Sequence, residues 1–394
     1  MSDNRKRGEV LLKKNEDRRL LAGHRWVFSN EIQTFPEKEG SPLLVDIRSS
    51  SGRFLGTGIF NPHSLISVRL LEGRVSSLSS YLDEGIARSL AMRDELGRNE
   101  DEGVRLVHSE ADGLPGLVVD RFGDYLSVQI TTRAFEEFSR EILDILSSRL
   151  HPRGIRIDRS LRARETEGLP VEEDRFEGEI PPEITIRIGG VSLRFSLREG
   201  QKTGLFLDQK DNVRALAPFL ARSRVLDGYC YIGGWSAAIA AHAKDSRLTG
   251  VDASEQAISL YRANVPKGHG ICSDFLSWGR KTRDAGERFD AVILDPPAFI
   301  KSRRLIKEGI EGYHAAFRLG LSLLAPRGIF VACSCSALLS WEDFSGILRS
   351  VFQKEGRRAR MLYQGRAAWD HPRLLAMPEL DYLKCAAFWV EERG

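Results

Sequence analysis

Strand-like and helical hydrophobic patterns alternate along the chain from about Arg222 onward. Short apolar runs are separated by stretches in which apolar positions recur at the spacing of an amphipathic helix. The strand-like runs are RVLDGY, RLTGVD, FDAVILD and GIFVAC, and the helical ones are WSAAIAAHA, SEQAISLYRANV, 308–324 and 341–352. This alternation predicts a parallel α/β sheet covered by helices on both faces. A final apolar run, Tyr382–Val390, is expected to add a late strand that could run antiparallel.

The amino-terminal half follows a different pattern. Short β-like runs between residues 8 and 75 are separated by Gly, Pro and Asn-Pro turn signals, which predicts a small β-rich domain. Residues 80–96 and 133–150 have helical spacing and enclose two strand-like segments, so a central α+β domain is expected. We therefore divide the chain into residues 1–76, 77–185 and 186–394. The charged stretch Arg162–Pro182 is interpreted as an excursion or linker.

The composition limits the class of protein. With 394 residues, 42% hydrophobic and 29% charged, the chain is typical of soluble globular proteins. We find no signal peptide and no apolar run of the roughly 18 residues that a membrane span needs. The five cysteines are scattered without a CxxC pair and His is sparse, so we expect a reducing cytoplasm and no metal site.

The charge is weak evidence for a nucleic-acid partner. The net charge is only +3, but basic residues outnumber acidic ones between Arg5 and Arg25. That local excess could contact phosphates. It fits a solvated charged face about equally well.

A glycine-containing loop follows the first strand of the α/β region. It runs from Asp227 to Gly234 with the spacing G-x-x-x-x-G-G, which is neither the dinucleotide GxGxxG nor a Walker loop. A nucleoside with a small charged tail, such as S-adenosylmethionine, suits this loop, with Asp227 near its cationic end. Asp252 ends the second strand 25 residues later and can accept the ribose hydroxyls, and Asp274 could reach the adenine amine. Each acid alone is more often a helix cap, but their recurrence at successive strand ends favours a site.

Two further strands end in chemically unusual residues, Asp295-Pro296-Pro297 and Ser334-Cys335-Ser336. Parallel strands deliver such residues to the carboxyl edge of the sheet. A thiol beside an Asp-Pro-Pro loop indicates a nucleophile facing a flat base, the chemistry of pyrimidine carbon-5 methylation. In this reading Asp295 activates the base, and the prolines with Phe299 shape a pocket for it. A lone cysteine ending a strand is usually a buried hydrophobe, the reading that we give to Cys230, Cys272, Cys333 and Cys385.

These segments resemble the PUA-domain type of bacterial 23S ribosomal RNA large-subunit methyltransferases, which make 5-methylcytosine. The resemblance covers nearly the whole chain, through DRRLLAGHRWVFSNEI, SEADGLPGLVVDRFGDYLSVQ, EGQKTGLFLDQKDN, LDGYCYIGGWS, LDPPAF and SCS. It implies a Rossmann-like class I methyltransferase sheet with an N-terminal PUA-like domain and a central α+β domain. The implied cofactor is S-adenosyl-L-methionine and the implied partner is 23S ribosomal RNA.

The resemblance also implies roles for residues that match its motifs. Cys335 and Asp295 would be catalytic, and Lys202, Pro296, Pro297 and Phe299 would contact the substrate. The cofactor-binding residues would be Gln201, Thr203, Phe206, Asp208, Asp227, Tyr229, Gly233, Asp252, Asp274 and Asp295. One departure is Ala298, where many relatives carry Lys after the Asp-Pro-Pro motif.

Three other functions remain open at this stage. Methyl transfer to a guanine or amine nitrogen would not need Cys335. A PUA-type RNA-binding protein with a vestigial catalytic half would not bind S-adenosylmethionine. A nicotinamide-dependent dehydrogenase is disfavoured because GxGxxG is absent. A homodimer is compatible with the sequence.

Overall fold

The computed structural model describes residues 7–36, 43–97, 101–198 and 204–392. The chain divides into two units. The first consists of residues 1–182, 197–205 and 370–378, and the second of residues 183–196, 206–369 and 379–394. The boundaries that we place at residues 76 and 185 stay predictions. No helix in the described ranges is long and apolar enough to cross a membrane.

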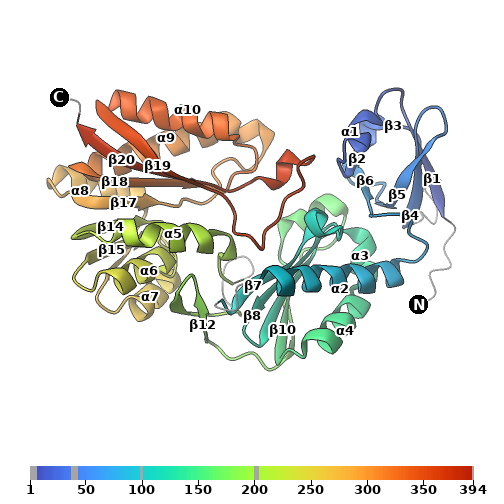
Figure 1. Ribbon diagram of the computed structural model, residues 1–394, viewed down its shortest axis with the longest axis horizontal. Coiled ribbons are helices and arrows are strands. Elements are labelled where there is room, and N and C mark those ends of the chain that lie inside the picture. The colour runs from blue at the N-terminus through green and yellow to red at the C-terminus, as the bar shows by residue number, and fades with distance from the viewer. Residues whose placement is uncertain (1–6, 37–42, 98–100, 199–203, 393–394) are drawn as a thin grey trace. The chain divides into compact units, whose positions relative to one another are not determined.

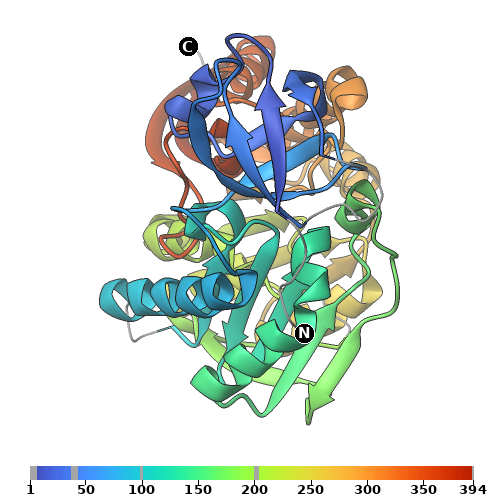
Figure 2. The ribbon, with the colours of Figure 1, turned by 90° about the vertical axis from the view of Figure 1, so that its right-hand side faces the viewer.

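A six-stranded sheet forms the amino-terminal part of the first unit, as the turn-rich pattern predicts. Its strands are β1 (Gly8–Leu12), β2 (Trp26–Phe28), β3 (Ile32–Thr34), β4 (Leu44–Arg48), β5 (Phe54–Phe60) and β6 (Ile66–Leu70), with the short helix α1 (Arg18–Leu21). The strand order is β2-β6-β5-β4-β1-β3, and the blue strands curve around a shared core in Figure 2. Alternate residues such as Val10 and Leu12 are fully buried there, so the period-two pattern sets which face is inside.

The rest of the first unit is the expected α+β domain. Its helices are α2 (Leu78–Leu96), α3 (Arg133–Glu137) and α4 (Ser139–Leu150). Its strands are β7 (Gly103–His108), β8 (Leu117–Phe122), β9 (Tyr125–Ile130), β10 (Gly154–Asp158) and β11 (Arg175–Gly178), in the order β11-β10-β9-β8-β7. Helices α2 and α4 pack together against this sheet (Figure 2).

The interpretation of residues 162–182 as a linker is wrong. Strand β11 lies in this stretch and pairs with β10, and the Arg164 side chain is almost completely buried. The buried Glu167 carboxylate accepts hydrogen bonds from Asn61 Nδ2 at 2.7 Å, Ser64 Oγ at 2.8 Å and Arg69 Nη2 at 3.0 Å. Because a buried charge needs such partners, these residues fix the amino-terminal sheet to the central domain.

The second unit contains the predicted open sheet. After the hairpin β12 (Ile184–Ile188) and β13 (Val191–Phe195), seven strands pair in the order β16-β15-β14-β17-β18-β20-β19. The first five are parallel, and β20 runs antiparallel to both of its neighbours. The strands are β14 (Arg224–Gly228), β15 (Arg247–Asp252), β16 (His269–Cys272), β17 (Phe289–Leu294), β18 (Leu324–Ser334), β19 (Arg357–Gly365) and β20 (Lys384–Glu392).

Helices cover both faces of this sheet, as expected for a parallel sheet (Figure 1). One face carries α5 (Lys210–Leu220), α6 (Gly234–His242) and α7 (Glu255–Asn264). The other carries α8 (Phe275–Asp284), α9 (Ile306–Leu323) and α10 (Trp341–Lys354). The strands of the sheet centre are almost wholly buried, which explains their continuous apolar runs.

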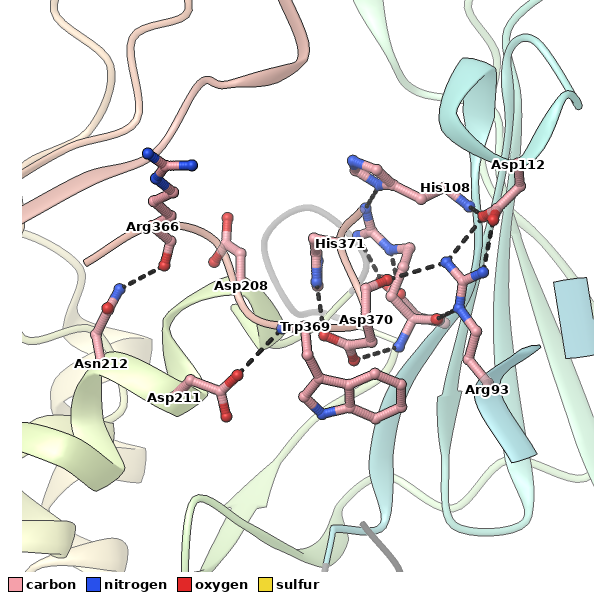
Figure 3. Close-up of polar contacts among 12 residues, drawn as sticks. Arg93, His108, Asp112, Asp208, Asp211, Asn212, Arg366, Trp369, Asp370 and His371 are labelled. Atoms are coloured by element: carbon pink, nitrogen blue, oxygen red, sulfur yellow. Dashed lines mark hydrogen bonds and ion pairs between the residues drawn. The ribbon is translucent and has the colours of Figure 1, made fainter. Parts of the chain in front are cut away.

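The segment between β19 and β20 is anchored twice (Figure 3). In the second unit, α5 holds its backbone: Asn212 Nδ2 donates to the Arg366 carbonyl at 2.9 Å, and Trp369 N donates to Asp211 Oδ2 at 3.1 Å. In the first unit, the buried Asp370 accepts from the backbone N–H of Arg105 at 2.9 Å and contacts His371 Nδ1 at 2.9 Å. Both anchors consist of buried or partly buried hydrogen bonds, which order the chain just before β20.

Candidate active site

Three predicted acids meet at the carboxyl edge of the second unit's sheet. Asp227, Asp252 and Asp295 stand at or just after the ends of the neighbouring parallel strands β14, β15 and β17. Asp227 is buried, and this burial raises its pKa to about 7, an effect that the nearby charges of Asp295 and Asp252 reinforce and the Ser236 hydrogen bond opposes. The three carboxylates therefore form one electrostatic cluster that favours a cationic ligand.

The loop after β14 has an unusual backbone conformation and contacts one of the three acids. Tyr229 and Tyr231 adopt positive φ angles of 62° and 48°, which are unfavourable for residues with a side chain and mark functional loops. Gly233 has φ of +88°, and a Cβ atom there would lie 2.7 Å from the Tyr261 ring. The glycine is thus required both by conformation and by space. Tyr231 N donates to Asp252 Oδ2 at 3.0 Å, which ties the loop to the second acid.

Asp227 has one oxygen available for a ligand. Its Oδ2 accepts from Ser236 Oγ at 2.7 Å and Ser236 N at 3.2 Å. Its Oδ1 is buried and has no hydrogen-bond partner among the described residues. A buried acceptor without a partner is costly, so this atom fits the ammonium or sulfonium end of a nucleoside ligand.

The remaining predicted cofactor residues lie around this loop. Asp274 caps α8 by accepting from Ser277 N at 2.9 Å, and burial together with the Asp274 charge raises the pKa of Tyr229. The Phe206 ring packs on Tyr231 with centroids 5.2 Å apart. Asp208 is buried and accepts from Tyr382 Oη at 2.8 Å. Gln201, Lys202 and Thr203 lie outside the described residues.

Asp295 is positioned by two side chains that sequence reasoning missed. Gln209 Nε2 donates to Asp295 Oδ2 at 2.9 Å, and Trp235 Nε1 approaches the same oxygen at 3.4 Å. Both donors stabilise the ionised carboxylate. Gln209 lies in the FLDQKDN segment, and Trp235 directly follows the glycines of the loop. Their position next to these motifs is the feature of the sequence from which they could have been predicted.

Cys335 and the Asp-Pro-Pro segment come together, as the sequence predicts for neighbouring strands β17 and β18. The Cys335 Sγ atom lies 4.0 Å from the Pro296 carbonyl oxygen, and the side chain is partly exposed. Pro296 is buried and Pro297 is exposed. Phe299 lies between the Tyr229 and Tyr313 rings, with centroid distances of 6.3 and 4.8 Å. A partly exposed thiol thus lies beside the Asp-Pro-Pro segment, and Phe299, which follows that segment, packs among aromatic rings.

The other cysteines divide into two groups. Cys230, Cys333 and Cys385 are buried, which confirms their reading as packing residues. Cys272 is exposed, so its reading as a core residue is wrong. It ends β16, which is at one edge of the sheet and pairs only with β15 among the described strands. Within the described residues, no group of three or more His, Cys, Asp or Glu side chains could hold a metal ion.

Comparison with known proteins agrees with this arrangement. Residues 10–72 match the PUA-like domain family, and residues 174–345 match the S-adenosylmethionine-dependent methyltransferase family. The ribosomal RNA large subunit methyltransferase I of Klebsiella pneumoniae strain 342 is 31% identical over 387 residues, covering 95% of this chain and 96% of that protein. The protein of the same name from Escherichia coli O157:H7 is also 31% identical, over 95% of this chain and 97% of its own length.

Solved structures share the fold over almost the whole chain. A candidate S-adenosylmethionine-dependent methyltransferase from Streptococcus mutans superposes with a TM-score of 0.82 at 20% identity, covering 97% of this chain and all of that one. A candidate methyltransferase solved with S-adenosylhomocysteine gives 0.84 at the same identity and coverage. The predicted α/β fold, with a β-rich PUA-like domain and a C-terminal methyltransferase sheet, is confirmed. S-adenosylmethionine is the cofactor of this sheet, and the chain belongs to the ribosomal RNA large subunit methyltransferase I family.

Proposed function

We propose that the protein methylates carbon 5 of a cytosine in 23S ribosomal RNA, with Cys335 as the nucleophile. The observation that carries this proposal is the partly exposed Cys335 thiol beside the Asp-Pro-Pro segment, at the sheet edge that also holds Asp227, Asp252 and Asp295. The name of its relatives, ribosomal RNA large subunit methyltransferase I, supports large-subunit ribosomal RNA as the substrate.

The residues of the site divide the chemistry between them. Cys335 adds its thiolate to carbon 6 of the cytosine, which makes carbon 5 nucleophilic. Asp295 hydrogen-bonds the cytosine and stabilises the activated form: its carboxylate accepts from the exocyclic amine, or from the ring nitrogen once that nitrogen carries a proton. Pro296, Pro297 and Phe299 border the pocket for an unstacked base. When bound, S-adenosylmethionine supplies an electrophilic methyl group for carbon 5. After loss of the carbon-5 proton to a base, the carbon–sulfur bond breaks and the thiolate leaves.

We assign the cofactor contacts by the same geometry. Asp252 accepts the ribose hydroxyls, Asp274 reaches the adenine amine, and the unpartnered oxygen of Asp227 faces the cationic end. The family resemblance, rather than the geometry, adds Gln201, Thr203, Phe206 and Asp208 to the cofactor contacts and gives Lys202 a contact with the substrate. Tyr229 and Gly233 shape the loop that the nucleoside approaches.

Cofactor affinity should depend on pH through Asp227. The pKa of the Asp227 carboxyl is about 7 in the free protein, and only its ionised form attracts a cationic ligand. The fraction of Asp227 that is ionised grows as the pH rises. We expect the dissociation constant for S-adenosylmethionine to fall roughly fivefold to tenfold between pH 6 and pH 7.5. Isothermal titration calorimetry at several pH values measures this change.

Two variants separate this effect from titration of the cofactor itself. Asp227→Asn should bind weakly with a flat profile over the same range. Asp252→Asn should also bind more weakly but keep most of the slope, since Asp227 is intact. An unchanged slope in Asp227→Asn would show that another group titrates.

We further propose that the amino-terminal domain docks on folded RNA. Several of its basic residues are partly neutralised within the domain, because Arg7, Arg19 and Arg25 pair with Asp46, Glu31 and Glu72. Lys14 and Arg18 remain exposed on the turn and helix after β1 and form no ion pair in the described part of the chain. These two side chains are therefore the better candidates for phosphate contacts.

Reversing both charges, Lys14→Glu with Arg18→Glu, should weaken binding of ribosomal RNA about tenfold at low salt and reduce the salt dependence. Affinity for S-adenosylmethionine should not change. The matched control reverses the exposed Lys281 and Arg349 of the second unit. Filter binding over a salt series measures both; equal losses in the two variants would argue against docking by this domain.

The proposed product is tested directly by nucleoside analysis. Unmodified ribosomal RNA is incubated with the protein and methyl-labelled cofactor, digested, and separated by mass spectrometry. We expect the label in 5-methylcytidine. Label in a methylated guanosine would contradict the proposal. RNA without label would show that the protein does not methylate this substrate.

A further inference from the structure

A lysine is buried in the strand next to the Cys335 loop. Lys384 is the first residue of β20 and its side chain has no exposed surface. It pairs in register with Ser334 of the antiparallel strand β18, and directly opposed residues project to the same face of a sheet. Its Nζ atom donates to the Ser336 carbonyl at 2.7 Å and to the Tyr382 carbonyl at 2.8 Å. The ammonium therefore holds the residue that follows Cys335.

The two serines beside Cys335 are held just as firmly. Ser334 Oγ donates to Tyr313 Oη at 2.8 Å, and Ser336 Oγ lies 2.8 Å from the same phenol oxygen. Ile300 N, shortly after the Asp-Pro-Pro motif, donates to Ser336 Oγ at 3.3 Å. Within the Ser334-Cys335-Ser336 segment, Cys335 alone is thus partly exposed, and hydrogen bonds to α9 and to Lys384 of β20 hold its neighbours.

A buried ammonium needs a compensating interaction, because burial disfavours charge. Burial lowers the pKa of Lys384 to about 8, while Asp381 and the Cys335 thiol act in the opposite direction. Lys384 forms no ion pair within the described ranges, and its bonded acceptors are neutral carbonyls. At neutral pH it is still mostly protonated. A thiolate at Cys335 is an anion that this cation can stabilise.

We propose that Lys384 is the residue that prepares Cys335 for attack: its buried ammonium fixes the loop that presents the thiol and stabilises the thiolate electrostatically. This inference rests on the proposed function, in which Cys335 is the nucleophile. Lys384 acts through Cys335 and is a positioning residue. The titratable groups that act on it are Asp381, which precedes its strand, and Cys335, which follows β18. The Tyr313 phenol on α9 contacts the two serines that flank Cys335.

The test measures the ionisation of the thiol without RNA. Full-length protein carrying Cys272→Ser, which removes the exposed cysteine, is alkylated with iodoacetamide between pH 6 and pH 9.5, and modification of Cys335 is followed by mass spectrometry. Lys384→Gln keeps hydrogen-bond donors but removes the charge. We expect its alkylation rate at pH 7 to fall about tenfold and to approach the parent rate at high pH, where the thiol is ionised in both.

Two further variants separate charge from structure. Lys384→Arg retains the cation and should restore most of the rate at pH 7. Lys384→Met also removes the charge and has an unbranched side chain of similar length. It serves as the uncharged variant if Lys384→Gln does not fold, and should show the same loss of rate at pH 7. Identical pH profiles for the parent, Lys384→Gln and Lys384→Met would overturn the proposal and leave Lys384 a structural residue. Because no RNA is present, this outcome is distinct from a failure to form 5-methylcytidine.

Discussion

Replacing Cys335 with alanine should lower methyl transfer to ribosomal RNA by about 10⁴-fold or more, the scale on which loss of a covalent nucleophile acts. Without the thiol, carbon 5 of cytosine is too weak a nucleophile to react. Neither flanking serine can replace it, because Ser334 and Ser336 are buried and engaged with Tyr313. Binding of S-adenosylmethionine should stay within about twofold, because the cofactor acids are untouched. Single-turnover assays with methyl-labelled cofactor measure the rate.

The matched control is Cys272→Ser, which changes an exposed cysteine that plays no part in the proposed chemistry. Its activity should equal that of the unmodified protein. If Cys335→Ala retained full activity, the target would be a nitrogen atom, whose lone pair needs no thiolate adduct. Cys335 would then be a partly exposed packing residue.

Replacing Asp295 with asparagine should lower the turnover rate by about 10²-fold to 10³-fold, the usual effect of removing one preorganised electrostatic partner of a transition state. Gln209 and Trp235 hold the carboxylate in place, so the substitution keeps its size and position while removing its charge. The cofactor dissociation constant should change less than the turnover rate. The effect should appear under saturating cofactor and RNA.

Asp290 offers a control on the same strand. It lies at the opposite end of β17, where its side chain accepts from Arg224 N at 2.9 Å. Asp290→Asn should therefore leave turnover near that of the unmodified protein. Equal turnover in Asp295→Asn and the unmodified protein would place Asp295 outside the reaction and restrict it to holding the loop.

The parts of the fold that can be predicted from the sequence are those that depend on local hydrophobic patterns. Four of the five parallel strands of the second unit, β14, β15, β17 and β18, follow from short apolar runs, because a largely buried strand has few polar positions to interrupt it. The acids of the site follow from the same runs, since Asp227, Asp252 and Asp295 come at or just after strand ends. Chain direction then places them at one edge without further information.

The missed features depend on partners far apart in the chain. Residues 162–182 are highly charged and look solvated, yet Glu167 is buried against Asn61, Ser64 and Arg69 about a hundred positions earlier. Lys384 is the first residue of a strand whose other residues are mostly apolar. The hydropathy pattern does not predict that its ammonium donates a hydrogen bond to the Ser336 carbonyl. Strand β19 was also missed, because its exposed face carries charged residues at an edge of the sheet.

The measurement that tests the central claim most directly is trapping of the covalent adduct. Ribosomal RNA containing 5-fluorocytidine is incubated with the protein and methyl-labelled S-adenosylmethionine, and the products are digested and mapped by mass spectrometry. Fluorine at carbon 5 cannot leave as a proton does, so the bond between Cys335 and carbon 6 should persist after methyl transfer. We predict a labelled nucleotide attached to the Cys335 peptide. Methylated RNA from unsubstituted substrate, with no adduct at Cys335 from the fluorinated one, would contradict the thiolate mechanism.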